Sequence, residues 1–273
     1  MAVEQELKKW FAANWQKVAL SLLSISVFIA GWHLFSEYLR ATSPSLYEYI
    51  PPPAQVLDAL IRSFTVLDPT SNLYMTDHIW ASLKRIVLGF LLAVGLALPI
   101  GLLMGSLKGA EAAGKPIVEM FRPIPPLAWI PIFLVIFGIV WGPVAIVFLG
   151  IFFPVLLNVI FGVKTVDPVL VDAARTLGAK RGHIFTKVVL PFTVPYFMTG
   201  VKVGLGVGWM CIVAAEMLGG VGGGVGFYIF SKATTSQYDL MFAGMIVIGL
   251  LSTLTTGLAG VFEDRLYRWM GMR

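Results

Sequence analysis

Residues of the kinds that carry out catalysis are few in this sequence, and their spacing supports no reaction. The stretch from Gly109 to Lys115 has the form GxxxxGK, which in nucleotide-binding proteins is a loop that holds phosphates. Pro116, however, stands where a Ser or Thr would hold magnesium, and an apolar stretch follows at once. The three histidines are scattered without metal-ligand spacing, and no nucleophile lies near a candidate base. We therefore predict no catalytic residue, no metal site and no cofactor bound by this chain.

The remaining candidates are charges within or beside apolar stretches, where each is costly unless it has a role or a partner. Lys202 either extends its ammonium group to the membrane surface or forms a positive wall of an inner vestibule that attracts anions. Lys84 and Arg85 either anchor to lipid phosphates or give the outer mouth a positive field. Glu216 is expected to be a structural member of an ion pair or hydrogen bond. An unpaired carboxylate would repel any anion that these cations attract.

Two tryptophans, Trp129 and Trp209, lie in the apolar stretches whose backbone is most interrupted by proline or lined by glycine. Prolines placed this deep in a membrane free backbone carbonyl groups, which is tolerated only where protein or water satisfies them. We expect both indole rings to be packing residues; should the chain prove to form a path through a membrane, the alternative is that they are bulky gate elements that narrow it.

The composition indicates an integral membrane protein. The chain has 273 residues, of which 58% are hydrophobic and 13% charged, and its mean hydropathy is +0.84. A soluble domain this apolar would expose large hydrophobic patches. The single cysteine, Cys211, cannot form an internal disulfide, and in a membrane protein the position of the charges matters more than the net charge of +5.

The apolar pattern predicts an all-α protein with about six membrane spans. They are expected at 18–35, 79–107, 117–139, 143–163, 191–218 and 240–262. We divide the chain into residues 1–40 (an interfacial helix and the first span), an extracytoplasmic segment over 41–77 with an amphipathic helix over 54–64, a transmembrane core over 78–264, and a cytoplasmic tail over 265–273. A glycine-rich stretch, 219–226, is expected to be a flexible turn.

Two rows of small residues predict close helix packing. One row recurs every four residues in the second span and the other in the fifth; they consist of Gly89, Ala93, Ala97, Gly101 and Gly105, and of Gly200, Gly204 and Gly208. Small residues at this spacing let the backbone of another helix approach closely within a membrane.

A polar segment over 164–191, called the coupling loop below, interrupts the apolar spans. Asp167 can cap a helix, and Pro168 fits its first position. The apolar residues 170, 173, 174 and 177 then share one helix face, and Gly178 is expected to end the helix in a left-handed conformation. A second short helix should follow, up to Pro191. Two short helices joined by a glycine suit the groove of another protein.

The distribution of basic residues predicts the orientation of the chain. Segments 1–17, 106–122, 164–191 and 263–273 hold 14 of the 20 Lys and Arg residues, whereas the segments on the opposite side hold five. Basic residues accumulate on the cytoplasmic side of membrane proteins. We therefore expect both termini and the coupling loop to be cytoplasmic.

The sequence resembles the permease subunits of ABC importers, whose cytoplasmic loop has the form E-A-A, three residues, G, nine residues, I-x-L-P. Here Asp172-Ala173-Ala174 is followed by three residues, Gly178, nine residues and VVLP ending at Pro191, so Asp replaces Glu and Val replaces Ile. The stretches RPIPPLAWIP (122–131) and AAEMLGG (214–220) resemble the branch that serves nitrate, sulfonates, taurine and bicarbonate. The resemblance covers residues 78–262.

The resemblance implies a type I importer permease that relies on partners for energy. Two ATPase subunits, which bind ATP and magnesium, would dock on the coupling loop; the implied docking residues are Leu170, Asp172, Ala173, Ala174, Leu177, Gly178 and Pro191. A second permease copy, an external binding protein (periplasmic or lipid-anchored) and membrane lipid are the other implied partners, with no nucleic acid. The implied cargo is a small anion (nitrate or nitrite, bicarbonate, taurine or another sulfonate), carried across the inner or plasma membrane.

Two other classes of protein fit the sequence less well. An ion-coupled secondary carrier usually has an internal repeat and polar groups at mid-membrane. No convincing repeat is found, and only Lys202 and Glu216 are expected at depth. A membrane-bound enzyme would need a polar catalytic cluster, which the sequence does not indicate.

Overall fold

The computed structural model describes residues 2–219 and 223–270, which are helical almost throughout. The elements in chain order are α1 (Ala2–Thr42), α2 (Pro44–Tyr47), α3 (Pro53–Thr65), α4 (Met75–Ser106), α5 (Lys108–Phe121), the 3-10 helix η1 (Pro126–Trp129), α6 (Ile130–Lys164), α7 (Pro168–Thr176), α8 (Arg181–Ile184), the π-helical turn η2 (Phe185–Val189), α9 (Leu190–Gly219), α10 (Val225–Thr234) and α11 (Tyr238–Trp269). These residues contain no strand beyond one isolated bridge between Asp68 and Leu73. The expected all-α architecture is confirmed.

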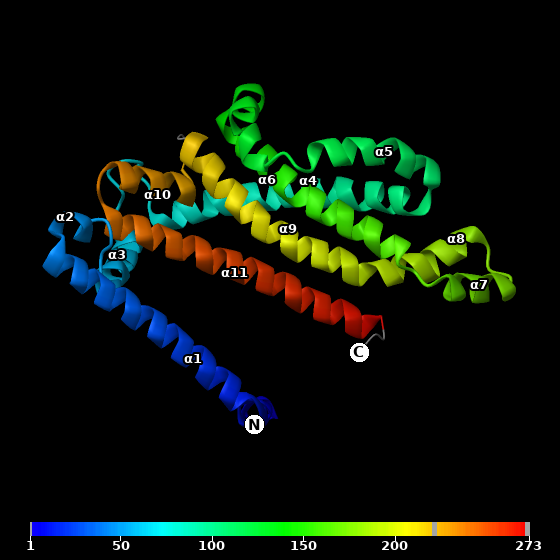
Figure 1. Ribbon diagram of the computed structural model, residues 1–273, viewed down its shortest axis with the longest axis horizontal. Coiled ribbons are helices and arrows are strands. Elements are labelled where there is room, and N and C mark those ends of the chain that lie inside the picture. Colours follow the sequence, from blue (N-terminus) through cyan, green and yellow to red (C-terminus); the bar gives the residue numbers. More distant parts are fainter. Residues whose placement is uncertain (1, 220–222, 271–273) are drawn as a thin grey trace.

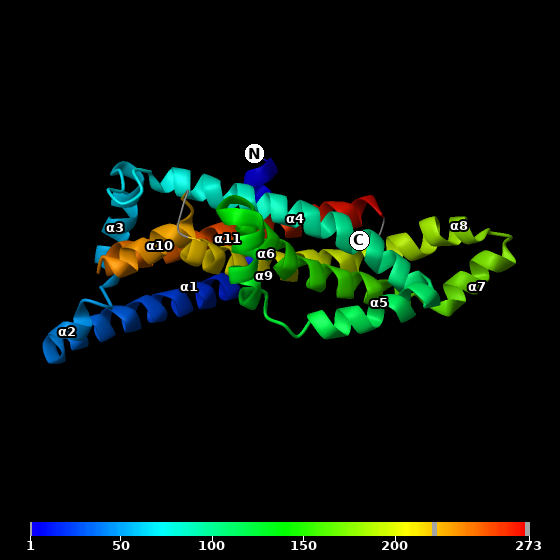
Figure 2. The same cartoon turned by 90° about the horizontal axis from the view of Figure 1, so that it is seen from above.

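The long helices α4, α6, α9 and α11 lie along the longest axis of the molecule (Figure 1). Helices α2, α3 and α10 gather at one end, called the α3 end below (Figures 1 and 2). Helices α5, α7 and α8 lie toward the opposite end, called the α7 end. α1 leaves the α3 end at an angle and diverges from the bundle, so it adds little to the core.

The first row of small residues packs α4 against α6. A Cβ atom added at Gly89 would lie 2.5 Å from Val147, and one added at Gly105 would lie 2.6 Å from Val163. The residues of α6 that fill these places recur every four positions, as the glycines do, so the two helices stay in contact over several turns. The close approach predicted from the sequence is confirmed.

The second row packs α9 on the other side of α6. Cβ atoms added at Gly204 and Gly208 would lie 3.0 and 2.9 Å from Ile151. α6 therefore lies between α4 and α9, and its buried residues Val155 and Val159 belong to the main apolar core. This core fixes α4 and α9, which carry most of the buried polar residues described below, on either side of α6.

Among the described residues, five helices rather than about six are long and apolar enough to cross a membrane: Trp15–Thr42, Met75–Ser106, Pro126–Lys164, Arg181–Gly219 and Tyr238–Trp269. The span expected over 117–139 is interrupted at its prolines, as the sequence predicts, and does not cross as one helix. It is divided among α5, η1 and the start of α6, because the prolines that follow Arg122 cannot donate helical hydrogen bonds. Gly138 then has φ 71° and ψ −178°, and Gly142 packs against Leu134, so the start of α6 folds back on the rest.

The segments outside the core also differ in detail from expectation. The interfacial helix expected over 1–17 is continuous with the first span in α1, whereas the amphipathic helix expected over 54–64 is α3. Val56 and Ala59 of α3 are buried. α11 extends to Trp269, so the expected tail over 265–273 begins as helix, and its last three residues lie outside the described part of the chain.

Candidate functional site

The coupling loop is built from local signals that the sequence carries. The Oδ1 atom of Asp167 accepts a hydrogen bond from the backbone N–H of Val169 at 2.9 Å and caps α7. At the other end, Gly178 has φ 81°, and its N–H donates to the carbonyl of Arg175. The N–H of Ala179 donates to the carbonyl of Ala174, which completes a Schellman motif. The predicted start and end of this helix are confirmed.

Two leucines of the coupling loop, Leu170 in α7 and Leu177 directly after it, are exposed. Leu170 is 47% exposed and Leu177 is 88% exposed, and no residue of α7 is buried in the described structure. Asp172 pairs with Arg175 at 3.1 Å, so the acidic residue of the loop motif is tied within its own helix. α7 projects from the bundle in both views (Figures 1 and 2), so the rest of the described chain leaves its exposed leucines uncovered.

The second part of the coupling loop differs from the expected short helix. α8, the π-helical turn η2 and α9 form one continuous helical segment from Arg181 to Gly219. Pro191 is half-buried near the start of α9 rather than at a break. Because Pro191 has no N–H to donate, the preceding turn widens to the π form instead of ending the helix.

A buried ion pair joins α4 to α9 at the α3 end. Glu216 is 3% exposed, and its carboxylate accepts hydrogen bonds from Arg85 Nη1 at 2.7 Å, from Ser82 Oγ at 2.8 Å and from the N–H of Gly226 at 3.0 Å. Glu216 thus has the partners expected of a structural ion-pair member. Because the Arg85 guanidinium is paired with this carboxylate, it does not supply the free positive charge that the outer-mouth hypothesis requires.

The glycines that follow α9 are held against this ion pair. Arg85 Nη1 also donates to the carbonyl of Gly223 at 2.8 Å, and the N–H of Gly224 donates to His78 Nδ1 at 3.1 Å. A Cβ atom added at Gly224 would lie 2.4 Å from the Glu216 carboxyl carbon. Residues 223–226 are therefore fixed by contacts rather than being the flexible turn expected from glycine content; residues 220–222 of that turn lie outside the described residues.

The hydrogen bonds continue from His78 to a second buried ion pair. His78 Nε2 lies 3.1 Å from Ser71 Oγ, which donates to Asp68 Oδ2, and Lys232 Nζ donates to Asp68 Oδ1 at 2.6 Å. Because the hydroxyl proton goes to Asp68 and Nδ1 accepts from Gly224, Nε2 carries the proton of the imidazole. Burial acts to raise the pKa of Asp68, but the Lys232 ammonium and the hydrogen bonds hold it below its ordinary value.

These groups together form what we call the buried polar cluster: Asp68, Ser71, His78, Ser82, Arg85, Glu216 and Lys232. It links the loop after α3 to α4, α9 and α10. Sequence reasoning singled out Arg85 and Glu216 but missed the others. One sequence signal could have indicated them. His78 and Ser82 lie one helical turn apart at the start of an apolar segment, close to Lys84 and Arg85.

Other predicted site residues also have partners within the protein. Lys202 Nζ donates to Glu263 at 2.6 Å, and its charge is thereby neutralised, which weakens the hypothesis of a positive vestibule wall at this position. The Trp209 ring is buried, and its Nε1 donates to Thr255 Oγ1 at 2.8 Å. Trp129 stacks between Phe121 and Phe133 with centroids 5.9 and 5.8 Å away. Lys84 is exposed and lies 5.1 Å from the Trp80 ring.

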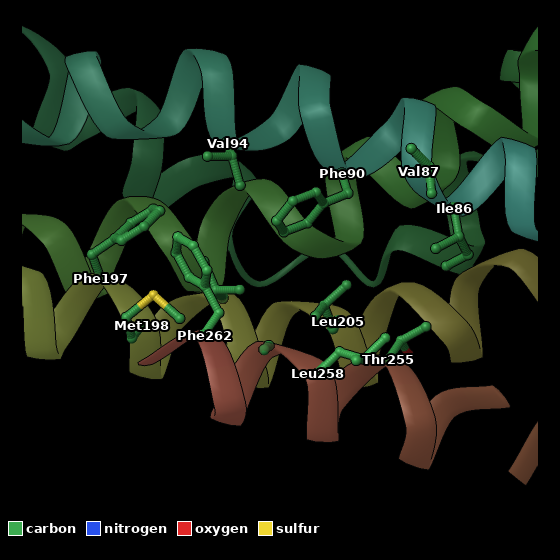
Figure 3. A pocket seen from close by; sticks show the side chains of 12 residues that line it. Ile86, Val87, Phe90, Val94, Phe197, Met198, Leu205, Thr255, Leu258 and Phe262 are labelled. Atoms are coloured by element: carbon green, nitrogen blue, oxygen red, sulfur yellow. The ribbon is translucent and has the colours of Figure 1, made fainter. Parts of the chain in front are cut away.

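A cavity of about 460 Å³ lies between α4, α9 and α11 (Figure 3). Phe90 and Val94 point into it from α4, Phe197 and Leu205 from α9, and Phe262 from α11. Thr255 is its one polar lining residue, and its hydroxyl already bonds to Trp209. Because the lining offers no charged group, this cavity does not suit a small anion.

The long apolar helices, the ion pairs buried between them and the exposed helical loop define a multi-pass integral membrane protein. A family model described as "Binding-protein-dependent transport system inner membrane component" matches residues 97–268, and the chain belongs to this family of ABC transporter permease subunits. It is 35% identical to the taurine transport system permease protein TauC of Escherichia coli over 96% of this chain and 94% of TauC.

Two further relatives are also named as permeases. The chain is 39% identical, over 95% of both chains, to a Methanocaldococcus jannaschii protein classed as an ABC transporter permease. It is 31% identical to the nitrate import permease protein NrtB of Synechocystis sp. over 87% of this chain and 85% of NrtB. The family resemblance drawn from the loop motif is therefore confirmed.

Proposed function

We propose that this chain forms the translocation path of an ATP-driven importer for a small anion, with taurine or another sulfonate, nitrate or nitrite, and bicarbonate as the candidate cargoes. Relatives named for taurine and nitrate transport support this choice. The observation that carries the proposal is the exposed α7, with its fixed ends and uncovered Leu170 and Leu177. A helix with this surface at one end of a membrane bundle suits docking by a soluble motor subunit.

In the proposed mechanism two ATPase subunits, which bind ATP and magnesium, hold α7 in the cytoplasm. Their closure on ATP moves α7, and the continuous segment from Arg181 to Gly219 carries the movement through the membrane. At 1.5 Å per residue this segment is roughly 58 Å long. Its far end holds Glu216 and thus the buried polar cluster, so a movement at α7 changes the packing at the α3 end. Alternating access follows because the nucleotide-bound and nucleotide-free ATPases favour different arrangements of the permease.

A second copy of the chain completes the path in this proposal, and an external binding protein delivers the anion at the α3 end. Both termini are cytoplasmic. This orientation is supported by the basic residues near α7 and α5, and by α11, which runs from the α3 end toward the α7 end (Figure 1).

The test is reconstitution of the chain in proteoliposomes with the ATPase subunits and binding protein encoded beside it. Uptake of radiolabelled taurine or nitrate should require both ATP and the binding protein, and affinity purification of this chain should recover the ATPase. Uptake by the isolated chain, driven by an ion gradient without nucleotide, would instead establish the secondary-carrier alternative and refute the proposal.

A further inference from the structure

α5 returns alongside α4 and carries Arg122 deep into the apolar zone. A single residue, Leu107, separates the two helices, which run in opposite directions (Figures 1 and 2). Gly114 of α5 packs against Met104 of α4. Arg122 follows eight residues later, which in an antiparallel pair places it at about the level of Leu96.

This level is the middle of a long uncharged segment. Residues 86–105 of α4 include no polar or charged side chain. Twenty helical residues span about 30 Å, which is the thickness of the hydrocarbon core of a bilayer. Arg122 is exposed on the surface of the single chain at this depth. A guanidinium group placed there costs free energy unless it faces water or a compensating charge.

Arg122 differs from the other cations set among apolar helices. Arg85, Lys202 and Lys232 each have a carboxylate oxygen within 2.7 Å. Among the described residues, no carboxylate pairs with Arg122, and no hydrogen bond to its side chain is found. A carboxylate thus neutralises each of these three cations, whereas the Arg122 guanidinium remains available.

A line of charged residues leads to Arg122 along one face of α5: Lys108, Glu111, Lys115, Glu119 and Arg122. Their spacing of three or four residues places them in a single stripe. Glu111 pairs with Lys164 at the α7 end, and Lys115 lies 3.7 Å from Glu119, so the line begins at the end where α7 lies and reaches inward. These side chains are exposed or half-buried in the single chain, and a charged stripe of this kind fits the wall of a water-filled space rather than lipid.

We propose that this stripe is one wall of an aqueous vestibule open toward the α7 end, and that Arg122 binds the transported anion at the inner limit of that vestibule. The planar guanidinium donates two parallel N–H bonds to a pair of oxygens, which suits the sulfonate, nitrate and bicarbonate groups. The proposal rests on the proposed function, because a second copy of the chain supplies the opposite wall. It assigns to Arg122 the positive charge that the sequence had suggested for Lys202.

Cysteine labelling tests the vestibule without knowledge of the cargo. Cys211 is the only cysteine and is buried, so Cys211→Ala combined with Arg122→Cys leaves one thiol. In assembled transporter in inside-out vesicles, the membrane-impermeant anion 2-sulfonatoethyl methanethiosulfonate should label this thiol. Leu96→Cys in the same Cys211→Ala background is the control, because it lies at the same level on the exposed apolar face of α4 and should stay unlabelled. An unlabelled residue 122, or equal labelling of both thiols, would overturn the vestibule.

Uptake tests the role of the charge. Arg122→Gln should raise the half-saturating concentration of the anion or lower its uptake about 10- to 100-fold, the range expected for loss of a charged hydrogen-bond pair. Arg122→Lys should retain part of the uptake. Arg40→Gln, the same change at an exposed site paired with Glu37, is the matched control and should transport normally.

The outcomes separate the two proposals. If the wild-type complex shows ATP-dependent uptake and Arg122→Gln matches it in rate and half-saturation, the anion site is refuted while the importer stands. If the wild-type chain needs no ATPase, the importer proposal fails, and the labelling result still decides whether residue 122 faces water. Should Arg122→Gln not assemble, as judged by copurified ATPase, the Arg122→Cys labelling contrast with Leu96→Cys decides.

Discussion

Gly178 offers a clean way to perturb the coupling loop, because its requirement is conformational and not spatial. Its φ of 81° lies in the left-handed region, yet a Cβ atom there would meet no other atom within 4 Å. Substitution by valine therefore changes only the backbone preference of the helix end. For an L-residue this conformation costs about 1–2 kcal/mol, and a β-branched residue lies at the upper end of that range.

This cost is large relative to what holds α7 in place. α7 has nine residues, none of them buried, and short helices without packing are marginally stable. A change of one or two kcal/mol shifts the ratio of two conformations by a factor of roughly 5–30. Gly178→Val should reduce ATP-dependent uptake by about that factor, while the thermal midpoint of the permease stays within about 1 °C because the core is untouched.

The assay is uptake and ATP hydrolysis measured on the same proteoliposomes. In complexes with Gly178→Val, the binding protein should stimulate ATP hydrolysis only slightly. In complexes with Gly178→Asn, hydrolysis should remain largely coupled to uptake, because Asn tolerates the left-handed conformation. Normal coupled transport by Gly178→Val, or failure of Gly178→Asn to the same degree, would show that the left-handed end of α7 is not what the ATPase requires.

Further predictions concern the buried ion pairs and the helix contacts. Glu216→Gln should destabilise the detergent-purified protein by about 3–5 kcal/mol, because the 12%-exposed Arg85 side chain loses its carboxylate partner; a loss under about 1 kcal/mol in thermal denaturation would contradict this. The ion pair of Asp68 stabilises the fold at pH above the ordinary pKa of 3.8, and this stabilisation is lost as pH falls through the lower pKa of the folded state. Thermal midpoints measured from about pH 5 down to about pH 2 should therefore fall with acid more steeply in the wild type than in Asp68→Asn, and parallel curves would exclude the effect. Gly89→Ala should cost about 1–3 kcal/mol, because its Cβ would lie 2.5 Å from Val147, whereas Gly95→Ala, with nothing within 4 Å, should be neutral or slightly stabilising; equal midpoints would refute the packing argument.

Much of the coupling loop could be predicted from the sequence because its structure is local. Asp167, Pro168 and Gly178 act within one or two turns of their own positions, so their residue types determine how α7 begins and ends. The two rows of glycine and alanine likewise indicated helix contacts, because small residues serve close packing wherever the partner helix lies. The sequence did not say that both rows would face α6.

The polar contacts could not be predicted, because their partners lie far apart in the chain. Glu216 is 131 residues from Arg85, and Lys202 is 61 residues from Glu263. A charge in an apolar pattern indicates that a partner or a role exists but does not identify it. The basic-residue distribution places Arg122 in the cytoplasmic segment 106–122, and the prolines indicate that the span over 117–139 is interrupted, but neither pattern shows that the chain before the prolines turns back along α4. Prolines and Gly138 break that span, and the return of α5 along α4 places Arg122 within the apolar zone instead.

The π-helical turn Phe185–Val189 lies between the exposed leucines of the coupling loop and α9. Each residue of an α-helix rotates the chain by about 100°, so deleting a single residue from this turn would swing the docking surface around the axis of α9 by about that angle. In the proposed two-fold assembly both docking surfaces would turn in the same sense about their own helices and would no longer face the ATPase subunits proposed to bind them. In the proposed importer this wide turn therefore sets the direction in which α7 faces the ATPase, while α9 keeps its own face on α6.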